Sequence, residues 1–178
     1  MFNHSSNQEL QPSEIVRGAV AGAIGGILGA WAMNQVHVLV HPEPKPAHKT
    51  SPRSKEKRTN EDPATVKAAV AVSQKVLSHR LTKREKEIAE PVVHYGFGAS
   101  TGALYGAAAE VVPPITMGRG MAYGAAVWLF GDEMAVPAMG LSKKPTAYPA
   151  KLHADMFLKH LVFGLCLEAG RRLGKGIL

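Results

Sequence analysis

Residues 18–40 form an uninterrupted stretch of 23 residues that contains no Asp, Glu, Lys or Arg (GAVAGAIGGILGAWAMNQVHVLV). About 20 apolar residues are enough for an α-helix to cross the hydrocarbon core of a bilayer. A glycine-rich helix is intrinsically weak in water. In lipid the backbone must satisfy its own hydrogen bonds, and small side chains let helices approach closely. The stretch therefore predicts a membrane-spanning helix.

Two other structures are compatible with this stretch. One is the core helix of a soluble bundle rich in Gly and Ala, and the other is a cleaved signal peptide with Ala30-Trp31-Ala32 at its cleavage site. The polar 17-residue leader lacks a basic n-region, and the apolar run is long for a signal peptide. We therefore prefer a retained helix.

The rest of the chain predicts an all-α, four-span transmembrane helical bundle. Residues 1–16 are predicted to be a polar tail, 17–40 the first transmembrane helix, and 41–91 a basic loop. Residues 92–173 would hold three further transmembrane helices, over about 92–112, 118–140 and 152–173, with a tail at 174–178. Pro113 and Pro114 should stop the second span, and Pro137 should interrupt the third.

The predicted loop at 41–91 contains a solvated segment, an amphipathic helix and the start of the next helix. Residues 41–60 are rich in Pro and Lys without apolar periodicity, which predicts a solvated segment. Asp62 before Pro63 has the form of a helix N-cap, and apolar residues at helical spacing then predict an amphipathic helix of about 17 residues. Thr82 and Glu85 have the spacing of a capping box, so a new helix should begin there and continue, kinked at Pro91, into the second span.

Glycines recur every four residues in the predicted spans. Such ridges permit close helix crossings in membranes. We expect them to pack inside the bundle rather than between copies of the chain, and homo-oligomerisation stays open. The ridges comprise Gly18, Gly22 and Gly26; Gly98, Gly102 and Gly106; and Gly120 with Gly124.

Successive spans cross the membrane in opposite directions, so the end of the first span, the start of the second, the end of the third and the start of the fourth lie at the same face. The polar residues of the spans therefore fall into two groups, one at each membrane face, and His160 lies near mid-depth between them. Spacing supports a shared interior, since residues three or four apart lie on one helical face. The first group comprises Asn34, His37, His41, His94, Asp132, Glu133, His153 and Asp155, and the second Glu110, Arg119, Tyr123, Glu168, Arg171 and Arg172.

Ionisable groups at membrane depth are costly, so they usually pair, line a polar cavity or serve a function. We expect proton or ion handling, because histidine titrates near neutrality. The alternatives are a non-catalytic scaffold held together by its polar residues, and a protein that binds a divalent metal or haem. The candidates for proton or ion handling are His94, Asp132, Glu133, His160, Glu110 and Glu168, and those for a metal are His37, His94, Asp132 and His153.

Fixed-spacing motifs give no support to catalysis. The chain has no HExxH or CxxC sequence, no phosphate-binding loop, no nucleophile elbow and no dinucleotide-binding fingerprint, so we do not expect an enzyme. Its single cysteine, Cys166, excludes an intramolecular disulfide.

The charge distribution indicates a lipid surface rather than nucleic acid. The net charge is +7, but the 12 Lys and Arg of residues 41–91 alternate with 7 Asp and Glu and lack interleaved aromatic residues. Anionic lipid headgroups are the expected partner of this segment. The membrane face that holds the first polar group carries 15 basic residues, and the opposite face carries 5. Because basic residues are enriched on the cytoplasmic side, we expect the first face to be cytoplasmic and both termini to lie outside.

Several short motifs carry a family resemblance. They are HYGFG at 94–98, GALYG at 102–106, AEVVP at 109–113, PAMGL at 137–141, HLVF at 160–163, and Glu168 before Arg171-Arg172. Over about residues 82–173 the chain resembles the YagU-like family of small bacterial inner-membrane proteins. The basic linker at 41–62 is not shared with that family, and at Asp132 the family can carry another polar residue such as His.

The resemblance implies a multi-pass protein of the bacterial inner membrane, with four spans, an unassigned molecular activity and an association with acid tolerance. The positions that match the family pattern are His94, Tyr105, Glu110, Pro113, Gly140, His160 and Glu168.

Overall fold

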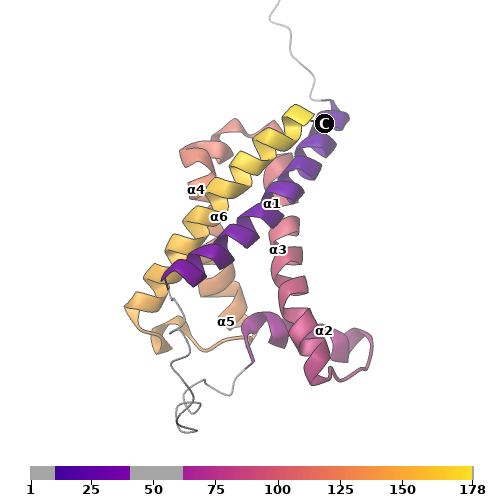
Figure 1. Ribbon diagram of the computed structural model, residues 1–178, viewed down its shortest axis with the longest axis vertical. Coiled ribbons are helices and arrows are strands. Elements are labelled where there is room, and N and C mark those ends of the chain that lie inside the picture. The colour runs from indigo at the N-terminus through magenta and orange to yellow at the C-terminus, as the bar shows by residue number, and fades with distance from the viewer. Residues whose placement is uncertain (1–10, 41–61, 178) are drawn as a thin grey trace, which may run out of the picture.

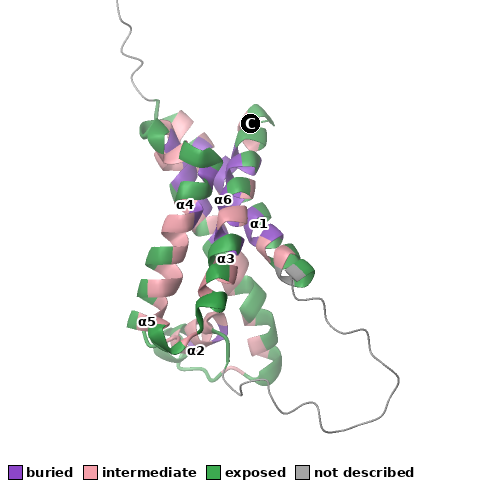
Figure 2. Ribbon diagram, turned by 90° about the vertical axis from the view of Figure 1, so that its left-hand side faces the viewer, coloured by how far each residue is buried: buried purple, intermediate pink, exposed green. Residues whose placement is uncertain are grey.

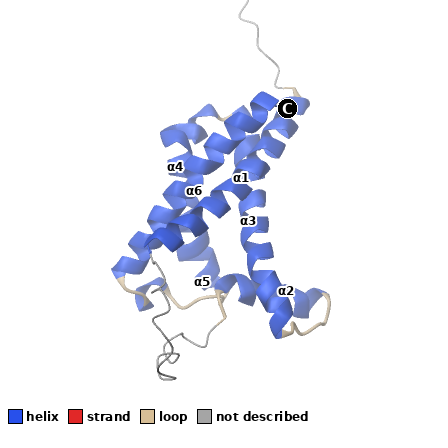
Figure 3. Ribbon diagram, in the orientation of Figure 1, coloured by secondary structure: helices blue, strands red, loops and turns tan. Residues whose placement is uncertain are grey.

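The computed structural model describes residues 11–40 and 62–177, and this part of the chain is helical without any strand (Figures 1 and 3). The all-α prediction is confirmed. The α-helices are α1 (Pro12–Val40), α2 (Ala64–Val76), α3 (Lys83–Val111), α4 (Met121–Val127), α5 (Val136–Ala138) and α6 (Ala150–Ile177). Two 3₁₀ segments, η1 (Pro113–Gly120) and η3 (Pro145–Ala147), and a π-helix, η2 (Trp128–Ala135), complete the described elements.

Helices α1 and α3 cross through their glycines (Figure 1). A methyl group added at Gly22 would collide with the backbone carbonyl of Gly102, and one added at Gly26 would collide with that of Gly98. The same holds for Gly106 against Gly18. The two ridges therefore face each other within one chain, at a separation that no larger side chain would permit.

Helix α6 forms two further contacts of this kind. Gly164 lies against the backbone of Gly120, and Gly124 against the carbonyl of His160, so that α4 packs closely on α6. On its other side, α6 packs on α1, where Gly25 lies against the backbone of Leu167. Helix α6 is thus held from two sides by backbone-to-backbone contacts.

Several predicted boundaries are wrong. Helix α1 begins at Pro12, inside the predicted tail 1–16, and α6 continues to Ile177, inside the predicted tail 174–178. The third predicted span, 118–140, is not one α-helix: Gly118, Arg119 and Gly120 have positive φ and form a turn, so that α4 begins only at Met121. The glycines make this left-handed backbone accessible.

The amphipathic helix in the loop is shorter than predicted. Helix α2 has 13 residues, because Ser78 adopts a positive φ and the N–H groups of Leu77 and His79 both donate to the carbonyl of Ser73. The predicted N-cap is wrong as well: Pro63 occupies that position, without a side-chain cap. The carboxylate of Asp62 instead accepts a hydrogen bond from Lys86 Nζ at 2.6 Å.

Helix α3 follows the sequence more closely. Thr82 and Glu85 form the predicted capping box, with hydrogen bonds in both directions. The helix runs through Pro91 and ends at Val111, before the Pro-Pro pair that was expected to stop it.

Large apolar side chains lie both in a small core of Tyr105, Phe163 and Leu167 and, in greater number, on the surface. The buried residues gather where α1, α3 and α6 meet, and many are small or ionisable (Figure 2). Among the apolar side chains on the surface, Trp31 is 54% exposed and Leu104 70% exposed. By length and composition, one described helix, Pro12–Val36, qualifies as a membrane span.

Candidate functional site

The two acidic residues at the centre of the candidate site lie on the π-helix. Pro137 has no N–H to donate, and its ring would collide with the carbonyl of residue 133 in a regular α-helix. The backbone widens instead, and the N–H of Val136 donates to the carbonyl of Gly131, five residues earlier. Short π-helical segments occur often at functional sites. This one carries Asp132 and Glu133.

Glu133 pairs with His153, near the start of α6. Nδ1 of His153 lies 2.7 Å from Oε1 of Glu133, and Nε2 lies 3.1 Å from the carbonyl oxygen of Pro145. A carbonyl oxygen only accepts, so Nε2 carries a proton. A second proton must lie between Nδ1 and the carboxylate, on one or the other. The pair is therefore a proton-holding unit in this geometry.

Asp132 faces His160 at the middle of α6. Nδ1 of His160 donates to the carbonyl of Met156 at 2.9 Å, which leaves Nε2 directed to Oδ2 of Asp132 at 3.6 Å. The His160 side chain is 7% exposed and that of Asp132 is 42% exposed. The imidazole is thus fixed in orientation, while the carboxylate keeps open space beside it.

Other polar groups nearby are already bonded. Lys159 Nζ donates to Asp155 Oδ2 at 2.6 Å, and both side chains are largely buried. His94 Nε2 donates to the carbonyl of Ala30 at 3.3 Å. Asn34 Nδ2 lies 3.3 Å from the hydroxyl of Tyr95.

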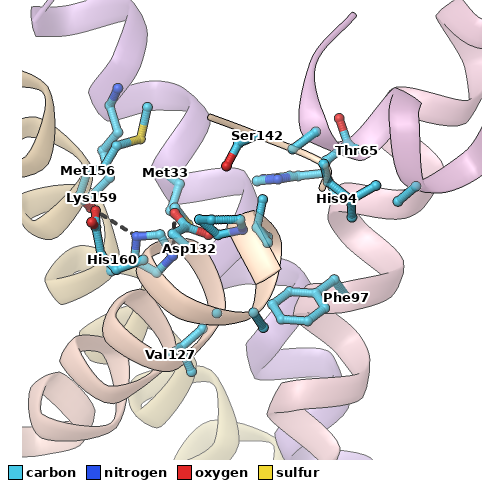
Figure 4. Close-up of a pocket in the computed structure, with 18 of the residues that line it drawn as sticks. Met33, Thr65, His94, Phe97, Val127, Asp132, Ser142, Met156, Lys159 and His160 are labelled. Atoms are coloured by element: carbon cyan, nitrogen blue, oxygen red, sulfur yellow. Dashed lines mark hydrogen bonds and ion pairs between the residues drawn. The ribbon is translucent and has the colours of Figure 1, made fainter. Parts of the chain in front are cut away.

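Most of these groups line one cavity of about 600 Å³; Asp155 and Tyr95 do not. In Figure 4, Asp132 and His160 are drawn beside each other, and His94 and Phe97 extend from α3. Cavities of this size, mostly apolar with a few polar groups, are typical of small-molecule sites. All six described α-helices, the π-helix and the segment that follows α5 contribute to the lining. Its polar members include Asn34, His94, Asp132, Glu133, Lys143, Tyr148, His153, Lys159 and His160.

A second polar cluster lies toward the other end of the bundle and is closed. Glu168 is 1% exposed and accepts hydrogen bonds from Tyr105, Arg171 and Arg172 at 2.6–3.0 Å. Glu110 accepts from Arg171 and from Lys175 at 3.1 and 2.6 Å. The Arg171 guanidinium also lies 6.0 Å from the centre of the Tyr105 ring. We call these residues the Glu168 network.

The predicted sorting by chain direction agrees with these two groups. Asn34, His94, Asp132, Glu133 and His153 line one cavity, and His160 joins them there. Asp155 does not line the cavity but pairs with Lys159, which does. Glu110 and Glu168, predicted as proton-handling residues, are separate from the cavity and belong to the Glu168 network.

The predicted metal set gains no support from the structure. Among the described residues, no three His, Cys, Asp or Glu side chains are arranged to hold a metal ion. Asp132 faces His160, and His153 is engaged by Glu133 and Pro145. The side chain of His37 and all of His41 lie outside the described part of the chain.

Sequence reasoning missed the Lys159–Asp155 pair and the role of Lys175. The i, i+4 spacing of Asp155 and Lys159 on a helix was a usable signal for the first. Lys175 reaches Glu110 across helices, 65 residues away in sequence, and no local pattern indicates that contact.

Comparison with known proteins gives one match. The family model described as "Protein of unknown function (DUF1440)" covers residues 46–169, which include α2 through most of α6 but not α1. No curated protein and no solved structure matches the chain.

Proposed function

Since the chain belongs to the DUF1440 family of proteins of unknown function, we propose a function from its geometry: it is an integral membrane protein that binds and transfers protons at the cavity. The observation that carries the proposal is the presence of two His–carboxylate pairs, His153–Glu133 and His160–Asp132, on the lining of one cavity. The acid tolerance that the family resemblance implied agrees with such a role.

The outward-facing apolar residues support the membrane part of the proposal. In water, Trp, Leu, Ile and Phe side chains of this number would be packed inside, and contiguous exposed apolar surface marks contact with lipid or protein. Here most of them lie on the outside of the long helices, while Gly, Ala, ion pairs and a small core of Tyr105, Phe163 and Leu167 fill the contacts between helices. We propose that α1, α3, the α4–α5 segment and α6 each cross the bilayer, in the bacterial inner membrane.

The charges in α6 fit this arrangement because they are paired. Lys159 is bonded to Asp155, and Glu168 is bonded to Arg171, within the same helix. Ionisable residues inside membranes are tolerated when they pair with each other or face the interior of the bundle. Pairing within the helix lowers the cost of placing these charges at membrane depth.

Proton transfer follows from the state of each pair. His160 has Nδ1 fixed as a donor, so only Nε2 can gain or lose a proton, and it does so facing Asp132. His153 already shares a proton with Glu133. Glu133 and Asp132 are adjacent in the chain, so a proton that leaves one pair enters the neighbourhood of the other. Histidine titrates within the physiological range, which makes such a relay reversible.

A flux assay tests this proposal. Purified protein is reconstituted in liposomes with a trapped pH-sensitive dye, and an external acid pulse is applied. We expect acidification faster than in empty liposomes for the native chain, and a rate near that of empty liposomes for Asp132→Asn and for His153→Gln. The matched control is His79→Gln, which changes an exposed histidine paired with Glu85 outside the cavity.

Two outcomes would overturn the proposal: native protein that moves protons no faster than empty liposomes, or cavity variants that conduct as well as the native chain. Absence of flux in a well-folded native protein would favour the scaffold alternative, which the saturated Glu168 network supports. Retention of the native chain in membranes after an alkaline wash tests the membrane assignment separately.

Other partners remain proposals. The basic segment 41–91 would contact anionic lipid headgroups, and α2 with its exposed Val72 and Val76 would lie at the membrane surface. The ridges Gly18–Gly26 and Gly98–Gly106 are used within the chain, so a homo-oligomer would have to form through other surfaces.

A further inference from the structure

The cavity is larger than proton transfer requires. Its volume of about 600 Å³ lies within the range of pockets that enclose drug-sized molecules. Most of its lining is apolar and is supplied by side chains such as Met33, Phe97, Val127, Met156 and Phe163. A chain of water molecules would be poorly held by such walls, whereas an apolar ligand would be well held.

Among the described residues, two carboxylates line the cavity, and Asp132 has more spare hydrogen-bonding capacity than Glu133. Glu133 is bonded to His153 at 2.7 Å. Within the described part of the chain, Asp132 has an ion pair with His160 at 3.6 Å and no hydrogen bond, and its side chain is 42% exposed. A carboxylate offers about four acceptor sites. Asp132 therefore presents negative charge to an apolar space.

We propose that the cavity binds a lipophilic monovalent cation, such as an amine or a quaternary ammonium or phosphonium ion with an apolar body, and that Asp132 is its counter-ion. The proposal rests on the proposed function, because it names the substrate class of the same site. The partly exposed carboxylate of Asp132 favours a cation over an anion at its position, although Lys143 and Lys159 also line the cavity, and the apolar lining favours a lipophilic ligand. Phe97, whose side chain lines the cavity and is 54% exposed, adds an aromatic face that attracts cations.

Protons and the cation would compete for Asp132. His160 faces it from α6, His94 lines the cavity from α3, and Glu133 is its neighbour on the π-helix. Lys143, from the segment after α5, and His153 and Lys159, from α6, complete the charged lining. A proton held between Nε2 of His160 and Oδ2 of Asp132 neutralises this carboxylate, so proton and cation exclude each other and cation binding weakens at low pH.

Two probes of equal shape and opposite charge test the proposal. Binding of tetraphenylphosphonium and of tetraphenylborate to the detergent-purified chain is measured by equilibrium dialysis, at about pH 8 and about pH 5.5, on either side of the usual histidine pKa. We expect saturable binding of the cation, weaker by at least fivefold at the lower pH, and no saturable binding of the anion.

Variants of cavity residues test whether the cation binds in the cavity. Asp132→Asn should weaken cation binding at least tenfold, and Phe97→Ala about fivefold. The matched control is Asp62→Asn, which changes a carboxylate paired with Lys86 outside the cavity and should bind as the native chain does. Circular dichroism and thermal melting verify that each variant is folded. If Asp132→Asn does not fold, Asp132→Glu serves in its place and should retain binding with a shifted pH dependence.

Equal binding of both probes would show partition into detergent and would overturn the inference, as would native affinity in Asp132→Asn. The flux assay separates this failure from that of the proposed function. Proton flux without cation binding overturns the inference and leaves proton transfer standing. Asp132-dependent cation binding without proton flux overturns proton transfer and leaves the ligand class standing.

Discussion

The Glu168 network and the cavity are built from the same kinds of residues but differ in how fully those residues are bonded. Glu168 accepts four hydrogen bonds from three side chains and is almost wholly buried. Asp132 has one distant partner, and its side chain faces open space. A saturated network has no capacity left for a proton or ligand, so it can only stabilise. The difference shows that bonding, rather than residue type, distinguishes structural from responsive charges.

The largest expected effect is on stability and separates the two regions directly. Glu168→Ala should lower the free energy of unfolding by about 3 kcal/mol, because the buried Arg171 loses two of its hydrogen bonds and keeps the one to Glu110. Asp132→Ala should change it by about 0.5 kcal/mol or less, since its side chain is partly exposed and singly paired. Thermal and denaturant unfolding in the same detergent measures both. Equal losses would contradict the comparison.

A smaller effect tests whether the hydrogen bonds of the network are charge-assisted. Tyr105→Phe removes the hydroxyl that donates to Glu168 at 2.9 Å and should cost about 2 kcal/mol. Its matched control is Tyr123→Phe, which removes a hydrogen bond to the neutral carbonyl of Thr101 at 2.7 Å and should cost about 1 kcal/mol. The reverse order in unfolding measurements would show that Glu168 does not carry its charge in the folded chain.

In the cavity, His153→Gln should lower stability only slightly, because the single amide nitrogen of glutamine cannot replace both Nδ1 at Glu133 and Nε2 at the carbonyl of Pro145. The same variant should also change the protonation of the carboxyl group of Glu133. Infrared difference spectra between about pH 5 and 8 should show a carboxyl signal that changes in this variant and is unaltered in Tyr105→Phe. A spectrum identical to that of the native chain would remove Glu133 from the proton-holding pair.

The smallest effect lies outside both regions and provides a baseline. The hydrogen bond from the Thr82 backbone N–H, with smaller contributions from the Thr82 side chain and His79, lowers the pKa of Glu85 from 4.5 to about 2. A group whose folded pKa is depressed stabilises the fold above its unfolded pKa. The contribution of this cap is therefore complete above about pH 4.5 and is lost as the pH falls toward 2.

Glu85→Gln should remove that dependence, measured as stability against pH for the two proteins. Thr82→Ala should cost about 0.5–1 kcal/mol at neutral pH and leave the cavity and the Glu168 network unchanged. A pH dependence that persists in Glu85→Gln would have to come from one of the other two regions.

Local patterns predicted much of the fold. The capping box at Thr82, the end of α3 before Pro113, and the existence of the glycine ridges all depend on residues a few positions apart, where the physical rule is steric or a single hydrogen bond. The boundaries that failed were helix ends. α2 ends early because Ser78 adopts a left-handed conformation that its sequence does not demand, and Asp62 leaves the cap position for a lysine 24 residues away.

The sequence predicted the acidic residues and histidines that line the cavity, but it did not predict which acidic side chain pairs with which basic one. Chain direction alone grouped Asn34, His94, Asp132, Glu133 and His153, because alternating helices return their ends to the same side. It also grouped Glu110 and Glu168 with Arg171 and Arg172, while assigning the two glutamates a proton-handling role that their saturated bonding does not favour.

The sequence by itself determined that this chain is helical, that its glycines allow close crossings, and that its charged residues divide between two ends. These properties follow from local backbone sterics and from the periodicity of the helix. Only the tertiary structure decided which acid meets which base, because pairing depends on the rotation and depth of each helix against the others. A π-helical widening at Pro137 places Asp132 on the wall of a cavity rather than in an ion network.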